Sequence, residues 1–198
     1  MRKVAITVVA VLAVEAAVAA AWIYSGFYPI AATQQHLPIT YAVIETAYNR
    51  SIARYAASVG EPPDLAQPGL LPEGLRHYQD HCAQCHGAPG VAPAPFSLGM
   101  TPVPPPIVGI ARHRTPAQIF WVIKHGVKMS GMLGWELKLE DAEIWAIVAL
   151  VTRMPTMTPI AYQEMVRSFG VPPPEAACPT VAAAARSADA VPAAGECL

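Results

Sequence analysis

The stretch Cys82-Ala83-Gln84-Cys85-His86 decides how the middle of the chain folds. The spacing Cys-x-x-Cys-His is the signature of a covalently attached haem. On one helical turn both thiols can reach the vinyl groups of the haem, and the histidine that follows offers its imidazole to the iron from the same side. We therefore expect one haem c, covalently attached through Cys82 and Cys85, with His86 as an iron ligand.

Two other uses of paired cysteines fit the sequence less well. A thioredoxin-like redox pair lies in a βαβ setting, and no strand pattern precedes Cys82. A zinc site needs a second pair of ligands at short spacing, whereas Cys178 and Cys197 are far apart in the sequence. Both alternatives lack the context that they require.

Four pieces of the sequence resemble the monohaem class I cytochrome c domain of membrane-anchored bacterial cytochromes. They are residues 77–78 with 82–87, the proline-rich loop that follows, residues 126–132 and residues 144–150. The resemblance extends over residues 75–155, fewer than half of the chain. It implies an all-α fold in which three or more helices surround one haem. It also implies that a loop carbonyl orients the iron-bound histidine, without identifying that carbonyl.

The same resemblance indicates the second iron ligand. Residues 131–135 read Gly-Met-Leu-Gly-Trp where these domains have Gly-Met-Pro-Ala-Trp, so Met132 is the expected ligand, with a leucine in place of the usual proline. Methionine opposite histidine raises the reduction potential of haem. Two other methionines, Met100 and Met129, lie at a plausible distance after the motif. Met129 is the main alternative and is otherwise expected to form a wall of the haem pocket. His113 and His125 are expected at the surface or at a helix end.

Helix signals surround the motif. Thr115 followed by proline predicts a helix that Gly126 ends, and acidic residues 140–141 predict the start of another. By the resemblance, this later helix crosses the one before Cys82, with Trp145 packed at the crossing. A further helix is expected to start at residues 158–159.

The N-terminus predicts a membrane anchor. Residues 4–24 are an apolar run of 21 residues, about 31 Å of helix at about 1.5 Å per residue. Arg2 and Lys3 precede it, so the positive-inside rule predicts a single pass of the bacterial inner (cytoplasmic) membrane with the haem domain on the periplasmic side. A cleaved signal peptide is the alternative. Glu15 within the run suggests docking against other membrane helices, or a tolerated protonated carboxyl.

The chain divides into four expected regions: the anchor at 1–30, an amphipathic helix and proline-rich linker at 31–72, the haem domain at 73–157, and a C-terminal helix with an Ala/Pro-rich tail at 158–198. Apolar residues at steps of three and four predict one continuous face on the helix at 39–59. This face could lie on the membrane surface, on a neighbouring subunit or on its own domain. In the tail, Cys178 and Cys197 could form a disulfide, stay free or pair with another chain.

These features predict the function. Apolar residues make up 54% of the chain and charged residues 14%, with a net charge of −1 that argues against nucleic acid as a partner. A haem held by His86 and Met132 has no open position, so we expect no catalytic residue and no enzyme acting alone. The expected role is a one-electron carrier that is anchored in the lipid bilayer. We expect it to be the electron-transfer subunit of a bacterial respiratory dehydrogenase or oxidase complex. Its expected partners are other membrane subunits of that complex, a redox partner protein, or both. The alternative is a haem-based sensor or small-ligand binder in which Met132 is displaced.

Overall fold

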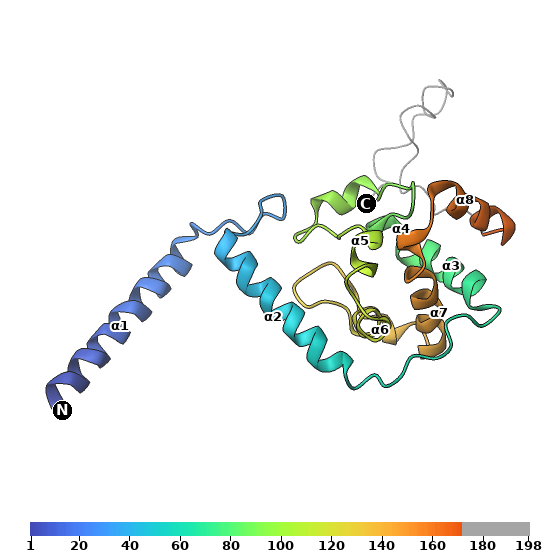
Figure 1. Cartoon of the computed structure of the whole chain (residues 1–198). Coiled ribbons are helices and arrows are strands. Elements are labelled where there is room, and N and C mark those ends of the chain that lie inside the picture. The colour runs from blue at the N-terminus through green and yellow to red at the C-terminus, as the bar shows by residue number, and fades with distance from the viewer. Residues whose placement is uncertain (172–198) are drawn as a thin grey trace, which may run out of the picture. The chain divides into compact units, whose positions relative to one another are not determined.

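The computed structural model describes residues 1–171, which form helices and no strand, as the all-α prediction requires (Figure 1). The tail with Cys178 and Cys197 lies outside these residues. The described chain falls into two units, residues 1–35 and the part from His36 onward. The α-helices are α1 (Arg2–Ser25), α2 (Pro38–Ala56), α3 (Leu70–His81), α4 (Ala83–His86), α5 (Ile107–Ala111), α6 (Pro116–His125), α7 (Asp141–Val151) and α8 (Pro159–Ser168). Three short 3-10 helices are η1 (Pro95–Gly99), η2 (Trp135–Leu137) and η3 (Met154–Thr156).

Helix α1 is a continuous helix of 24 residues, none of them buried, and it contains an 18-residue stretch with a mean hydropathy of 2.4. At about 1.5 Å per residue it is long enough to cross the hydrocarbon core of a bilayer. It ends at Gly26, whose φ of 68° lets its N–H donate back to the Ile23 carbonyl. Length and composition thus make α1 a candidate membrane span, and a signal sequence would meet the same criterion.

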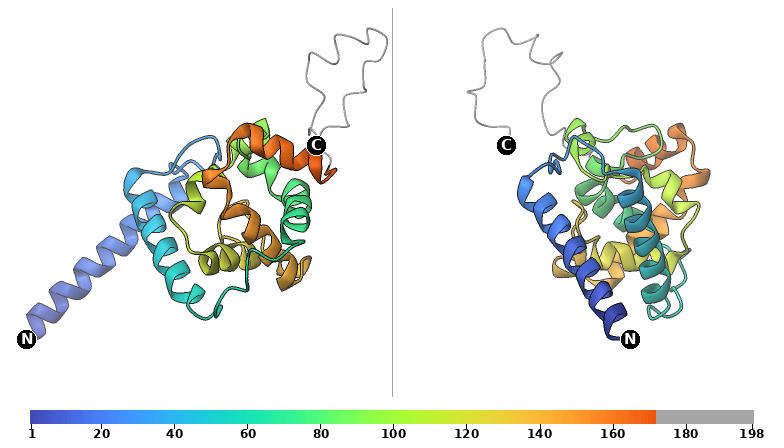
Figure 2. Two further views of the ribbon diagram at one scale, coloured as in Figure 1. Left: turned by 45° about the vertical axis from the view of Figure 1, so that its right-hand side comes forward. Right: turned by 90° about the vertical axis from the view of Figure 1, so that its left-hand side faces the viewer.

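The second unit is built around the crossing of α3 and α7, which lie side by side in both views of Figure 2. At the crossing, a Cβ atom placed on Gly74 would lie 2.0 Å from the backbone oxygen of Ala146. The two helix backbones therefore touch, and only glycine fits at residue 74. The fully buried side chains around this contact form the core: Leu75, Tyr78, Ile144, Ile147, Val148, Leu150, Val151, Met154 and Tyr162.

Trp145 does not lie at this crossing, so that part of the prediction is wrong. Its ring stacks on Phe120 of α6, with centroids 4.3 Å apart, and it is only half-buried. Ala146 is the residue of α7 that contacts α3 at Gly74. Adjacent residues of a helix point in different directions, so Trp145 faces α6 instead. Trp145 thus joins α7 to α6.

Helix α2 packs on α6 through its second half. Ile52 is fully buried, and Tyr55 stacks on Trp121 with ring centroids 5.7 Å apart. Arg114 lies over the Tyr48 ring at 5.5 Å. The first half is exposed, including Ile39, Tyr41, Val43 and Ile44. Of the three locations expected for this apolar face, the structure shows packing against the chain's own domain, and only for the second half of the helix.

The predicted helix caps are present. Thr115 and Gln118 form a reciprocal capping box at the start of α6, and Gly126 follows its last residue. Glu140 and Glu143 form the corresponding box on α7. The Thr158 side chain accepts from the Ala161 N–H at the start of α8. These local signals fix where the helices around the motif begin.

Replacing Gly74 with alanine tests the crossing. The added Cβ forces the backbones of α3 and α7 apart, and we expect Gly74→Ala to lower the free energy of unfolding by about 2 kcal/mol, within the usual range for overpacking. Urea unfolding of the full chain in detergent measures the change. Gly109→Ala on α5 is the matched control, because a Cβ there meets nothing within 4 Å. Equal stability of the two variants would contradict the close crossing.

Candidate haem-binding site

The Cys-x-x-Cys-His motif forms one helical turn directly after α3. The Cys82 N–H donates to the Tyr78 carbonyl at 2.9 Å, which continues the helical hydrogen bonding into the motif. The N–H groups of Cys85 and His86 both donate to the Cys82 carbonyl, at 3.1 and 2.9 Å. The two thiols and the imidazole therefore belong to the same turn, as attachment of one haem requires.

The residue after the motif has to be glycine. Gly87 has a φ of 63°, and a Cβ placed on it would lie 2.6 Å from the Val91 carbonyl oxygen. The buried Tyr78 hydroxyl donates a short hydrogen bond to the Gly87 carbonyl. Burial raises the pKa of Tyr78 well above its usual value, so the phenol stays a donor. Tyr78 thus ties α3 to the end of the motif.

The loop carbonyl that orients His86 belongs to Pro105. The His86 Nδ1 atom lies 2.9 Å from this oxygen. Because a carbonyl can only accept, Nδ1 carries the proton, and the lone pair of Nε2 is left for a metal. Burial lowers the pKa of His86, against a smaller opposing effect of the Pro105 carbonyl, which favours the neutral ring. A second bond, from the Ala94 N–H to the Gln84 carbonyl at 2.7 Å, holds the same loop against the motif.

The cysteines do not have the properties of a redox-active pair. Burial, with a contribution from Cys85, raises the pKa of Cys82 to about 12, and burial raises the pKa of Cys85 as well. A thioredoxin-like cysteine needs a lowered pKa instead. In the described residues neither thiol belongs to a group of three metal-binding side chains.

Met132 lies in a short loop that packs on the end of α6. It is half-buried against the apolar core. Its N–H donates to the Ser130 hydroxyl at 3.1 Å, and its carbonyl accepts from the Val127 N–H at 3.1 Å. Gly126, with a φ of 67°, lets this loop approach, because a Cβ there would lie 2.7 Å from the Met132 carbonyl oxygen.

The other candidate ligands are placed differently. Met129 is 77% exposed and has a φ of 60°. The Met100 sulfur lies beside the Met132 loop, 3.1 Å from where a Cβ on Gly131 would be. His113 and His125 are both exposed. His125 is the last residue of α6, where its Nδ1 lies 3.3 Å from a Glu136 carboxylate oxygen.

The side chains around the motif fit haem c. Two thiols on one turn, an imidazole with an available Nε2 and a half-buried thioether on a separate loop are the donor set that such a haem uses. Tyr78, Pro105 and Gly74 support this set, and the sequence did not identify their roles. The run of prolines before residue 107 was the one available signal, because it indicated a stiff loop without indicating which carbonyl faces His86.

Comparison with known proteins agrees with this geometry. Residues 69–151 match the family described as cytochrome c oxidase, cbb3-type, subunit III. Over 109 residues the chain is 34% identical to dihydro-heme d1 dehydrogenase of Pseudomonas aeruginosa. That match covers 55% of the chain and 20% of the relative, so the chain spans only about a fifth of that protein's length. No solved structure matches the chain. Residues 69–151 are therefore a cytochrome c domain, which implies a haem c cofactor and electron transfer.

Proposed function

We propose that the chain is a membrane-tethered one-electron carrier, with one haem attached through Cys82 and Cys85 and held by His86 and Met132. The observation that carries the proposal is the His86 Nδ1 contact with the Pro105 carbonyl at 2.9 Å. This contact fixes the tautomer that an iron ligand needs and holds the imidazole in one orientation. An isolated surface histidine would have no such constraint.

The chain's own residues keep the ligand set rigid. When bound, the haem supplies a reversible one-electron change at iron. His86 is held by the proline-rich loop, whose fixed φ angles limit its movement, and the Met132 backbone is hydrogen-bonded on both sides. A stiff pair of ligands changes little between the two oxidation states. With His86 and Met132 both holding the iron, the site would be suited to passing electrons and would have no place for a substrate.

The surroundings of the domain support a place in a membrane complex. Helix α1 is long and apolar enough to serve as an anchor, and the basic Arg2 and Lys3 favour a periplasmic haem domain in a bacterium. The matching family is described as an oxidase subunit and the relative is named a dehydrogenase, both of them redox enzymes. We therefore place the chain as the electron-transfer subunit of a bacterial respiratory membrane complex.

Removing the Met132 thioether tests the ligand set. We expect Met132→Ala to lower the reduction potential by on the order of 0.1 V, because the ligand that favours ferrous iron is lost. Potentiometric titration of the holoprotein measures the change, and Met129→Ala serves as the control that leaves the potential unchanged. An unchanged potential in Met132→Ala would exclude Met132 as the ligand and leave Met100 as the candidate.

Carbon monoxide separates the carrier from the ligand-binding alternative. At neutral pH the reduced wild-type protein should not bind carbon monoxide, since His86 and Met132 would both hold the iron, whereas reduced Met132→Ala should bind it. Visible absorption spectra of the reduced proteins provide the measurement. Binding by the wild type would favour a sensor in which Met132 is displaced.

The Glu15 carboxyl tests membrane assembly. A carboxyl in the apolar core of a bilayer is costly unless it faces a partner, so Glu15→Leu should leave haem attachment intact and reduce the haem-stained band at high mass on a native gel of gently solubilised membranes. Val8→Leu, on the same helix, is the control. N-terminal sequencing of the band determines whether α1 is retained. Unchanged assembly of Glu15→Leu would show that Glu15 has no partner.

A further inference from the structure

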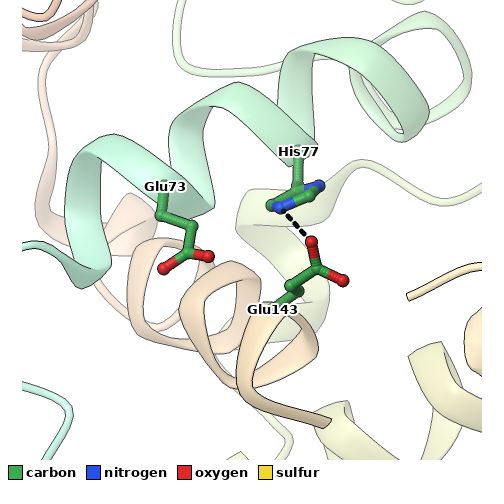
Figure 3. A group of neighbouring side chains, drawn as sticks. All are labelled: Glu73, His77 and Glu143. Atoms are coloured by element: carbon green, nitrogen blue, oxygen red, sulfur yellow. Dashed lines mark ion pairs between the residues drawn. The ribbon is translucent and has the colours of Figure 1, made fainter. Parts of the chain in front are cut away.

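A second cluster of metal-binding side chains lies away from the haem ligands, where α3 crosses α7. Glu73 and His77 are four residues apart on α3, and Glu143 is on α7. One ligating atom from each of the three lies within 4.8 Å of the others. Figure 3 shows Glu73 and His77 reaching from the same side of α3 toward Glu143. The His77 side chain is only 3% exposed, whereas that of Glu143 is 29% exposed.

The protein alone does not satisfy His77. Its Nε2 atom lies 2.7 Å from Nη2 of Arg76 and 3.1 Å from Oε1 of Glu143. A guanidinium only donates and a carboxylate only accepts, so one nitrogen of a neutral ring cannot suit both. Either Nε2 carries the proton and faces the arginine N–H, or it is a lone pair facing a carboxylate oxygen. The other ring nitrogen, Nδ1, is buried and has no hydrogen-bond partner in the described residues.

A cation resolves the contact between the imidazole and the carboxylate. With the proton on Nε2 and Arg76 turned away, this contact is an ordinary hydrogen bond; with the proton on Nδ1, the Nε2 lone pair and the Glu143 oxygen both face the same place, where they can coordinate a metal ion together. Glu143 Oε2 already accepts the Glu140 N–H at 2.8 Å, which leaves Oε1 for the ion. Arg76 is exposed, so its guanidinium is free to turn toward solvent.

We propose that Glu73, His77 and Glu143 bind a divalent transition-metal ion of the zinc class, with water as the fourth ligand. One imidazole nitrogen and two carboxylate oxygens are ligands that Zn²⁺ accepts. At bond lengths of about 2.0–2.2 Å, tetrahedral ligands lie about 3.3 Å apart, so the carboxylates have to close by up to about 1.5 Å. Glu143 is held by the Glu140 N–H, so the movement falls to the Glu73 side chain, which lies outside the core, and it requires no change in the helices.

The ion would act as a cross-link between two helices. It joins α3, which leads into the Cys-x-x-Cys-His turn, to α7, close to the Gly74 contact with Ala146. An ion that binds only the folded chain stabilises it by mass action. The site shares no residue with the haem ligands, so this proposal stands independently of the proposed function.

Zinc titration of the full-length holoprotein tests the site. The protein is stripped of metal with a chelator, and its free thiols are alkylated so that cysteines do not bind the ion. We expect one Zn²⁺ to bind with micromolar affinity in isothermal titration calorimetry and to raise the unfolding temperature. Glu73→Gln, at a position outside the core, should weaken binding by about ten-fold or more and remove the thermal shift, while the haem spectrum stays unchanged.

His125→Gln is the matched control. His125 also pairs with a carboxylate, that of Glu136, but no third ligand joins this pair in the described residues. Its loss should leave zinc affinity unchanged. His77→Gln should abolish binding, and if that variant does not fold, Glu73→Gln still decides. The proposal is overturned if Glu73→Gln binds as tightly as the wild type, or if the wild type binds no zinc below millimolar concentration.

Discussion

The contact between the backbones of α3 and α7 is the constraint on which the rest of the haem domain depends. Because Gly74 has no Cβ, the backbone of α3 lies directly against the backbone oxygen of Ala146. This approach buries Leu75, Tyr78 and Ile147 against one another, and it fixes the end of α3 from which the attachment motif continues. A side chain at residue 74 would move the whole turn that carries Cys82, Cys85 and His86.

Beyond this crossing, two side-chain hydrogen bonds to backbone carbonyls hold the haem-binding motif in place. Tyr78 holds the Gly87 carbonyl, and Pro105 holds the His86 ring. The same crossing leaves His77 buried with two incompatible neighbours. Burying a polar group of this kind without a suitable partner costs free energy, and this cost is the reason for the metal ion that we propose there.

The sequence predicted what depends on neighbours along the chain. The attachment motif and the capping signals at Thr115, Glu140 and Thr158 are local, because each is complete within five residues. The family resemblance implied the crossing of the two helices, but the glycine that permits it, Gly74, and the Pro105 carbonyl were not identified, because each depends on a partner 19 or more residues away. The same limit explains the error at Trp145, whose partner is decided by which face of α7 meets α3.

Proton NMR of the reduced holoprotein with labelled methionine methyl groups identifies the second iron ligand. The ring current of haem shifts a coordinated methionine methyl far upfield. We expect one such signal, which is lost in Met132→Ala and kept in Met100→Ala. A shifted signal that belongs to Met100 or Met129, or the absence of any shifted methionine signal, would contradict it.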